Sequence, residues 1–275
     1  MIWLVKQLLL EKNDLKKVAV VMAHPDDEVL GCGATIHKFS QEGMLVHLLI
    51  MATGLASRGV VEQEALETLK KQTRDAAHSL GVFSVEFADF PDNQMDTKPL
   101  LEIVKRVEKF IKVIQPDIVF THHRGDINID HEITQRAVLT ACRPLPAVKS
   151  CEIFACQVQS SSDFGRSDEQ LRADCYVRLS EENVSAALKA LSFYDGEIKD
   201  WPHPRSLQAV KNLAEMRGSE IGIKGAEAFL LLRDIIIYNN PNKPLKKGKL
   251  KLFKVKEFYY VLTLLNEKNE LKEYE

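Results

Sequence analysis

Short apolar segments recur along the first half of the chain, and charge-rich segments of helical length separate them. The apolar segments are residues 18–23, 44–51, 82–88 and 117–120. Apolar runs of roughly four to eight residues that end in turns are typical of strands buried on both faces of a parallel sheet. The pattern therefore predicts a series of buried strands before residue 121.

The segments between these strands show the repeat of apolar positions that helices have. The predicted helices are residues 34–41, 61–80, 99–114 and 130–142. Strands that alternate with helices of this length form βαβ units, and these units build parallel sheets. The expected fold class is therefore α/β, with a Rossmann-like, mostly parallel sheet flanked by helices.

The loops that follow the strands carry polar clusters. They span residues 24–28, 53–58 and 92–96, and a fourth follows Phe120. The carboxyl ends of parallel strands lie at one edge of the sheet, and open α/β sheets bind their ligands there. We therefore place the predicted site at the carboxyl ends of the strands.

The first of these loops, His24-Pro25-Asp26-Asp27-Glu28, combines one imidazole with three carboxylates. Ionised Asp and Glu are seldom buried without partners, and imidazole with carboxylate is a common set of zinc ligands. The alternative is a solvated acidic turn. A second cluster, in residues 121–131, favours a functional site.

Residues 121–131 contain three histidines and two aspartates. Asp130 has a structural explanation, because a helix N-terminus favours negative charge. His131 has no such explanation, and with His24 and Asp27 across the sheet edge it completes a set of two histidines and one carboxylate. Three protein ligands with one open position is the arrangement of catalytic zinc, so Zn²⁺ is the predicted cofactor.

Length and composition exclude several classes of protein. A chain of 275 residues fits one large α/β domain, or one domain with an appendage. The net charge of −2 argues against nucleic-acid binding, and no apolar run reaches the roughly 18 to 20 residues of a membrane span. Five cysteines without a CxxC pair favour a reducing, cytoplasmic location over a disulfide framework. Residues 1–10 are interpreted as a mature N-terminal element and not a signal peptide.

The second half of the chain continues the α/β pattern less regularly. Strands are expected at residues 151–156 and 173–179, and helices at residues 181–191 and 206–217. We predict a main domain in residues 1–237 and, in residues 238–275, a basic linker with a small C-terminal extension. A hairpin or a subunit contact is expected in this extension, which leaves a homo-oligomer open.

Both polar clusters resemble the motifs of the PIG-L (LmbE-like) family of zinc-dependent N-deacetylases. The first family motif stands here as AHPDDE at Ala23–Glu28, and the second, usually HPDH, stands as Asn128-Ile129-Asp130-His131. Shorter resemblances are LGV at 80–82, FPDN at 90–93, PHPRS at 202–206 and AEAF at 226–229. The resemblance covers residues 17–233.

The resemblance implies a role for each matching position. His24, Asp27 and His131 match the zinc ligands. Asp26 matches the general base, which takes a proton from water during attack on an acetamide carbonyl. Asp130 matches a carboxylate that orients a ligand or raises its basicity.

Asn128 departs from the family, which commonly has a histidine there that stabilises the tetrahedral oxyanion. An amide can donate a hydrogen bond to an oxyanion, but it carries neither a charge nor a transferable proton. Either Asn128 acts as a neutral donor, or His122, His123 or a later residue supplies the acid. His122 and His123 have a plainer interpretation as polar residues at a strand end.

Residues on the surrounding loops are expected to contact the substrate. These residues are Arg58, Asp92, His123, His203 and Arg205. Arginine can grip a phosphate or a carboxylate with two parallel hydrogen bonds, which would suit a nucleotide-linked sugar. The family often has a basic substrate-binding residue on the helix of residues 61–80, and the candidates here are Lys70, Lys71 and Arg74.

The sequence therefore predicts a zinc-dependent hydrolase that removes the N-acetyl group from a small-molecule amino sugar, either nucleotide-linked or a glycoconjugate precursor. One alternative is a metal-dependent phosphohydrolase, which would prefer oxygen ligands and would not need His24 and His131. The other is a non-catalytic sugar-binding protein on the same scaffold. The intact Asp26 argues against it, because binding alone needs no free base.

Overall fold

The structure is a computed structural model that describes residues 15–55, 63–144, 148–165 and 167–235, together with the strand residues 254–255 and 258–259. The chain divides into two compact units after Ile235. The domain boundary expected between residues 237 and 238 stays a prediction, because both residues lie outside the described ranges. In the second unit, β8 (Lys254–Val255) and β9 (Phe258–Tyr259) pair antiparallel.

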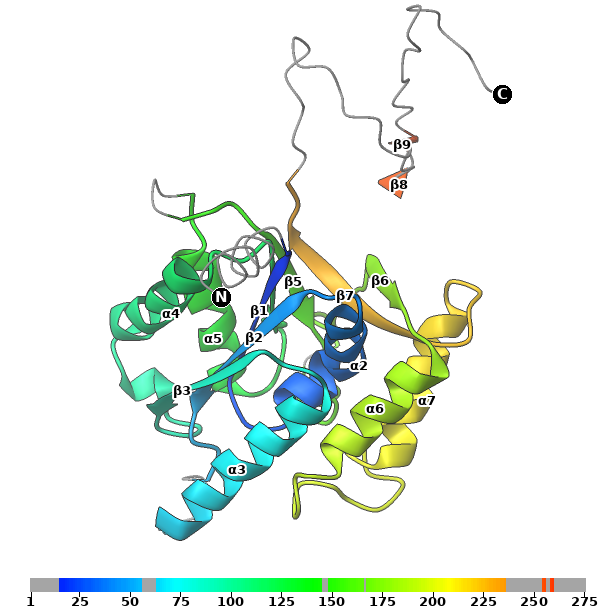
Figure 1. The fold of residues 1–275 in the computed structure, drawn as a ribbon, viewed down its shortest axis with the longest axis horizontal. Coiled ribbons are helices and arrows are strands. Elements are labelled where there is room, and N and C mark those ends of the chain that lie inside the picture. Colours follow the sequence, from blue (N-terminus) through cyan, green and yellow to red (C-terminus); the bar gives the residue numbers. More distant parts are fainter. Residues whose placement is uncertain are drawn as a thin grey trace, which may run out of the picture. The chain divides into compact units, whose positions relative to one another are not determined.

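In the described part of the first unit, seven strands form one sheet in the order β3-β2-β1-β4-β5-β7-β6 (Figure 1). Strands β1 to β5 run parallel to one another, whereas β7 runs antiparallel to both of its neighbours, β5 and β6. The strands are β1 (Lys17–Met22), β2 (Leu45–Ala52), β3 (Ser84–Phe90), β4 (Ile118–His122), β5 (Glu152–Cys156), β6 (Cys175–Arg178) and β7 (Ala226–Arg233). The predicted α/β fold with a mostly parallel sheet is confirmed.

Helices cover both faces of this sheet. Helices α2, α3 and α6 pack on one face, α4 and α5 pack on the other, and α7 packs against β7 (Figure 1). The helices are α2 (Asp27–Gln41), α3 (Gln63–Ser79), α4 (Leu100–Ile114), α5 (Ile129–Ala141), α6 (Glu181–Leu191) and α7 (Leu207–Ser219). Among the described residues, no helix combines the length and the apolarity that a membrane crossing requires.

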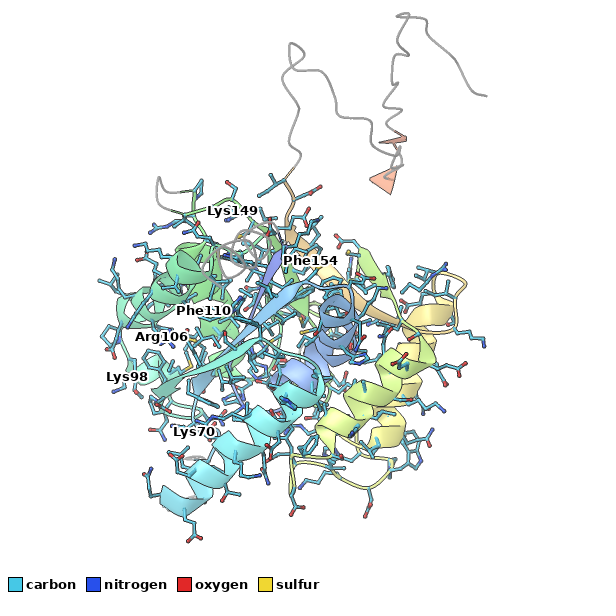
Figure 2. All side chains as sticks on the ribbon, in the orientation of Figure 1. Lys70, Lys98, Arg106, Phe110, Lys149 and Phe154 are labelled. Carbon is cyan, nitrogen blue, oxygen red and sulfur yellow. The ribbon has the colours of Figure 1, made fainter. Side chains whose placement is uncertain are left out.

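Strand β1 contributes to two hydrophobic cores. Val20 and Met22 pack with α2, α3 and α6, whereas Ala19 and Val21 pack with α4 and α5. Successive side chains of a strand point to opposite faces, so a strand covered by helices on both sides is apolar throughout. Figure 2 shows Phe110 of α4, which belongs to the second of these cores.

Helix α2 begins at Asp27, well before residue 34, where we expected it to start. The expected start at residue 34 left Gly31-Cys32-Gly33 outside the helix, but the helix includes these residues, with a kink at Cys32 (φ −156°, ψ 25°). Close packing explains Gly31, because a Cβ atom there would lie 3.1 Å from the Cβ of Cys156. Asp27 and Glu28 therefore form the first turn of a helix.

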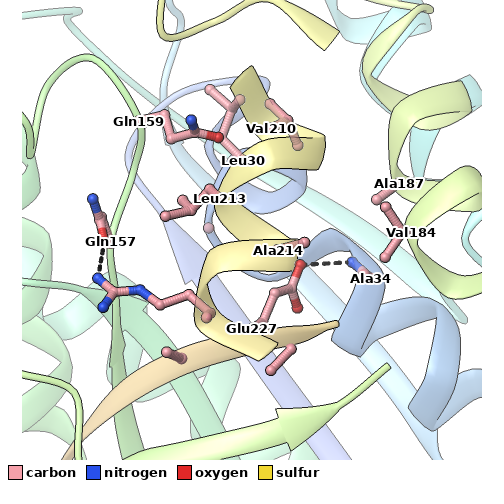
Figure 3. Close-up of a pocket in the computed structure, with 14 residues that line it drawn as sticks. Leu30, Ala34, Gln157, Gln159, Val184, Ala187, Val210, Leu213, Ala214 and Glu227 are labelled. Atoms are coloured by element: carbon pink, nitrogen blue, oxygen red, sulfur yellow. Dashed lines mark hydrogen bonds between the residues drawn. The ribbon is translucent and has the colours of Figure 1, made fainter. Parts of the chain in front are cut away.

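A carboxylate from β7 binds the kinked part of α2. Glu227 accepts hydrogen bonds from the backbone N–H groups of Ala34 (2.9 Å) and Thr35 (2.7 Å), and Figure 3 shows the contact with Ala34. A residue outside helical geometry interrupts the hydrogen-bond ladder, so the N–H groups that follow Cys32 resemble those at a helix N-terminus. Glu227, the acid of the AEAF motif, satisfies two of them.

Burial raises the pKa of Glu227 to about 7, although the hydrogen bonds from Thr35 and Ala34 oppose the shift. The carboxyl group also lines a cavity of about 40 Å³, which is large enough to admit water (Figure 3). A carboxyl group whose pKa is higher in the folded state binds its proton more tightly there. The stability that it contributes is therefore lost as the pH rises from the unfolded value toward 7.

We expect Glu227→Gln to change how stability depends on pH. Because the amide cannot ionise, the stability of the unsubstituted protein relative to the variant should fall by about 3 kcal/mol between about pH 4 and pH 8. Chemical denaturation at both pH values measures this difference, and Glu181→Gln, at an exposed position, is the control. A difference between protein and variant that does not change with pH would contradict the shifted ionisation of Glu227.

Candidate metal centre and active site

The two polar clusters meet at the carboxyl ends of β1 and β4, which are neighbours in the sheet. Strands β2 and β3 lie on one side of β1, and β4 and β5 lie on the other, so the chain changes direction across the sheet at this point. Open α/β sheets bind ligands at such a switch point. His24 follows β1, and His131 lies in the first turn of α5, which follows β4.

His24, Asp27 and His131 converge on one point. Nδ1 of His24 lies 3.2 Å from Nε2 of His131. Oδ2 of Asp27 lies 3.2 Å from the same nitrogen of His131 and 3.4 Å from Nδ1 of His24. The side chains are 11%, 1% and 1% exposed for His24, Asp27 and His131. The fold thus brings together the three residues that the sequence predicts as metal ligands.

The charges around this point fit a cation. Oδ1 of Asp27 is buried and has no hydrogen-bond partner among the described residues. Burial lowers the pKa of His131, but the neighbouring Asp27 and Asp126 outweigh it and raise the pKa to about 9. A group of side chains that binds a proton this tightly also favours a metal ion, and two imidazoles with a carboxylate are donors that zinc prefers.

The other ring nitrogen of His24 faces two carboxylates. Nε2 lies 3.0 Å from Oδ2 of Asp130 and 3.2 Å from Oδ1 of Asp92. The backbone N–H groups of Asn93 and Met95 donate to Asp130 at 2.7 and 3.0 Å. Carboxylates in this position fix the tautomer and the orientation of a ligand histidine. Asp92 therefore lies against His24, and its contact with substrate stays a prediction.

Asp126 supports His131 in the same way, although sequence analysis assigned it no role. Its Oδ2 lies 3.1 Å from Nδ1 of His131 and accepts hydrogen bonds from the hydroxyl groups of Ser161 and Ser162. The two serines lie on the loop after β5, and no sequence pattern places that loop beside Asp126. The sequence feature that pointed to a role for Asp126 was its position in the second polar cluster, residues 121–131.

His122 is buried beside the ligand histidine. Its Nε2 accepts a hydrogen bond from the N–H of Ala23 at 2.7 Å, and its ring stacks on that of His131 with centroids 3.8 Å apart. Burial and the charge of His131 lower the pKa of His122 to about 3. The ring is therefore neutral near pH 7 and poorly suited to act as the proton donor that sequence analysis considered.

Asp26 has different partners from the neighbouring Asp27. Its backbone is in the left-handed region (φ 94°), which is rare for a residue with a side chain. Its Oδ2 accepts a hydrogen bond from Nη1 of Arg205 at 3.0 Å. Burial raises the pKa of Asp26 to about 7, although Arg205 opposes the shift. A carboxyl group that titrates near neutrality can both take up and release a proton.

Glu28, the third acid of the first cluster, joins α2 to the segment after α6. It accepts one hydrogen bond from the backbone N–H of Asp26 at 3.2 Å and another from the hydroxyl group of Tyr194. Burial raises the pKa of Glu28 to about 8. These contacts give Glu28 a structural role in the loop that presents Asp26.

Asn128 is the N-cap of α5. Its Oδ1 accepts a hydrogen bond from the N–H of Asp130, and its Nδ2 donates to Oδ1 of Asn93, both at 2.9 Å. An amide nitrogen carries two N–H bonds, so Asn128 has a second donor besides the one that Asn93 uses. A neutral hydrogen bond to a substrate oxygen stays a prediction.

The other predicted substrate contacts are untested by this structure and stay predictions. Arg58 lies outside the described residues. Nε2 of His123 lies 2.6 Å from the carbonyl oxygen of Glu169, and Nδ1 of His203 accepts a hydrogen bond from the N–H of Arg205.

The basic candidates on α3 have partners within the protein. Lys70 and Lys71 form ion pairs of 2.7 and 2.6 Å, and Arg74 lies over an aromatic ring at 5.2 Å from its centroid; the partners are Asp89, Asp75 and Phe87, respectively. These contacts do not select one of the three as a substrate-binding residue.

Comparison with known sequences identifies a family match in the part of the chain that carries both clusters. Residues 19–142 match the PIG-L family model, which is described as GlcNAc-PI de-N-acetylase. The chain is also 29% identical over 151 residues to the uncharacterized deacetylase YaiS of Escherichia coli strain K12, an alignment that covers 53% of this chain and 78% of YaiS. The family resemblance is confirmed over residues 19–142, whereas the motifs at 202–206 and 226–229 lie outside this match and stay predictions.

Solved structures share the fold at low sequence identity. The N,N'-diacetylchitobiose deacetylase of Pyrococcus horikoshii has a TM-score of 0.62 and 20% identity, over 80% of this chain and 85% of that one. GalB, the 4-carboxy-2-hydroxymuconate hydratase of Pseudomonas putida KT2440, has a TM-score of 0.66 and 18% identity, over 82% of this chain and 100% of that one. Because a deacetylase and a hydratase share this fold, function has to be argued from the site.

We expect Asp126→Asn to weaken metal binding at this centre about 10- to 100-fold, with Zn²⁺ as the probe, because it removes the carboxylate beside Nδ1 of His131. Competition with a chromophoric chelator measures the zinc affinity. Asp75→Asn on α3 is the matched control, since Asp75 pairs with Lys71 at the surface. Equal zinc affinity in the Asp126 and Asp75 variants would contradict a supporting role for Asp126.

Proposed function

Over residues 19–142 this chain belongs to the PIG-L family, and we propose that it is a zinc-dependent hydrolase that removes the N-acetyl group from an N-acetylated amino sugar. The observation that carries the proposal is that two adjacent carboxylates have different partners. Asp27 faces the two histidines, whereas Asp26 pairs with Arg205 and lies outside the ligand set. A site that only binds sugar needs no general base beside its metal ligands.

Zinc would be held by Nδ1 of His24, the carboxylate of Asp27 and Nε2 of His131. In that position it supplies Lewis acidity, which polarises an amide carbonyl and makes water more acidic. Asp130 and Asp126 would orient the two histidines from their other ring nitrogens. This arrangement leaves Asp26 free of the metal.

Hydrolysis of the acetamido group adds water across its C–N bond and yields a free amine and acetic acid, which ionises to acetate and a proton near pH 7. The water oxygen bonds to the carbonyl carbon, and the proton that it loses passes to the carboxylate of Asp26. Asp26 then gives this proton to the nitrogen as the C–N bond breaks, which returns the carboxylate to its first state. Nδ2 of Asn128 donates to the carbonyl oxygen while negative charge develops on it.

The names of similar proteins support the substrate class. The family model is described as a GlcNAc-PI de-N-acetylase, and the Pyrococcus horikoshii protein is a diacetylchitobiose deacetylase. Both descriptions refer to N-acetylated glucosamine units. We therefore take N-acetylglucosamine compounds as the first substrates to test, including nucleotide-linked sugars and glycoconjugate precursors.

An open groove of about 390 Å³ borders Glu197, one of the residues that contact Arg205. Leu55, Leu69, Gln72 and Glu197 are among the residues that line it. Glu197 lies 3.4 Å from Nη1 of Arg205, the group that also pairs with Asp26. The groove therefore reaches the residues around the proposed general base.

The main test combines metal content with acetate release from a panel of N-acetylglucosamine compounds. We expect about one zinc per chain and acetate from at least one compound. Asp26→Asn should lower kcat about 10²- to 10⁴-fold, because the amide cannot accept the proton. The variant should keep its zinc, since Asp26 is not a ligand, and asparagine tolerates the left-handed backbone of this position.

Two results would contradict the proposal. Zinc without acetate release from any compound would favour a binding protein on the same scaffold. Loss of zinc in Asp26→Asn would show that Asp26 is needed for metal binding, so that its assignment as a free base is wrong.

Asn128→Ser separates the two roles of Asn128. Serine is also a good N-cap, so the melting temperature should change little, whereas loss of the amide donor should lower kcat about 10²-fold. Acetate-release kinetics and thermal denaturation measure the two effects. An unchanged kcat would show that another group stabilises the oxyanion. Asn183→Ser, at N3 of α6, makes the same substitution away from the site and is the control for effects on folding.

A further inference from the structure

The guanidinium of Arg205, which precedes α7, joins three segments of the chain. Nη1 donates to Oδ2 of Asp26 at 3.0 Å and to Oε2 of Glu197 at 3.4 Å. Nε donates to Oγ of Ser160 at 3.1 Å. These partners lie at the start of α2, in the loop after α6 and in the loop after β5. Arg205 therefore fixes Asp26 relative to two other loops at the sheet edge.

The local structure of Asp26 does not hold its side chain. Asp26 is the N-cap of α2, where an aspartate usually accepts a hydrogen bond from a backbone N–H of the first turn. Here the side chain makes no capping hydrogen bond, and the backbone has φ 94° and ψ −26°. Such a conformation persists where the surrounding structure maintains it.

Solvent does not hold the carboxylate either, because Asp26 is 1% exposed. Among the ion pairs of the described residues, the cation that pairs with Asp26 is Arg205, whose side chain is 23% exposed. A buried ionised carboxylate needs such a partner, and the partner determines where its oxygen atoms lie. The orientation of Asp26 therefore depends on a residue that is 179 positions away in the sequence.

We propose that Arg205 is a positioning residue, which holds the Asp26 carboxylate in the orientation that proton transfer requires. The inference rests on the proposed deacetylase function. It replaces the direct grip on substrate that the sequence suggested for Arg205. Arg205 acts on the reaction through Asp26, and the substrate has no direct contact with it.

The chemistry of arginine suits this role better than that of lysine. A guanidinium is planar and donates in several fixed directions, so it can bond to Asp26, Glu197 and Ser160 at the same time. An ammonium group on a flexible chain can reach Asp26 but does not reproduce this set of directions. Arg205→Lys should therefore recover only part of the function of Arg205.

The experiment is a double-mutant cycle on Asp26→Asn and Arg205→Ala, measured on the zinc-loaded full chain. For Arg205→Ala we expect kcat about 10²-fold lower, with KM changed by less than about threefold, because a displaced general base slows proton transfer and leaves binding intact. The double variant should be no slower than Asp26→Asn alone, since Arg205 acts through Asp26. Added guanidinium chloride should restore part of the kcat of Arg205→Ala.

Arg217→Ala, on α7, is the matched control. Arg217 is also partly buried, and it bonds to Gln157 and Glu220. We expect its kcat and KM to equal those of the unsubstituted protein. Guanidinium should have no effect on this variant.

Two kinetic results would overturn the inference. A KM raised about tenfold or more in Arg205→Ala with kcat unchanged would show that Arg205 binds the substrate directly. Multiplicative losses of kcat in the double variant would show that Arg205 and Asp26 act independently. If Arg205→Ala does not fold, the same cycle with Arg205→Lys decides between these outcomes.

The melting temperatures of the same proteins distinguish failure of this inference from failure of the proposed function. If the unsubstituted protein releases no acetate, the proposed function fails, and the thermal cycle still tests the pair. A decrease in melting temperature for the double variant that is smaller than the sum of the two single decreases supports coupling between Arg205 and Asp26. A decrease equal to that sum overturns the inference.

Discussion

Burial of several carboxyl groups at one edge of the sheet is the constraint on which the rest of this structure depends. Asp26, Asp27, Glu28, Asp92 and Asp130 are each at most 2% exposed. Ionised carboxylates are stable in the interior only with partners. Those partners come from α5, from the loop after β3 and from the segment between α6 and α7, so the contacts that compensate the buried acids also fix these elements relative to one another.

The pairing of β1 with β4 makes this concentration of charge possible. His24 and His131 are 107 residues apart in the sequence, yet parallel pairing of the preceding strands brings their rings together. Each ring has one nitrogen toward Asp27 and the other toward a second carboxylate. Asp130 and Asp126, on the far side of the two rings, therefore orient the ring nitrogens that face Asp27.

Sequence patterns predicted the parts of this structure that depend on local order. Alternating strands and helices imply a parallel sheet, and a parallel sheet implies a shared edge where His24, Asp27 and His131 can meet. The start of α2 was predicted wrongly, because Gly31, a residue of low helix propensity, lies inside the helix and allows close packing against Cys156. The contacts of Asp126 and Arg205 depend on the paths of loops far away in the sequence, and local patterns do not encode such paths.

The limits of family similarity and of the folded unit differ in this chain. The family match ends at residue 142, yet three residues beyond it bind α2. Tyr194 and Arg205 bond to Glu28 and Asp26 at the start of this helix, and Glu227 bonds to its kinked part. A fragment that stopped at 142 would keep every proposed ligand and lose the compensation of two buried acids. The segment that matches the family is therefore not sufficient for this site by itself. A design that places the site on another scaffold would also have to include the segments that contain Tyr194, Arg205 and Glu227.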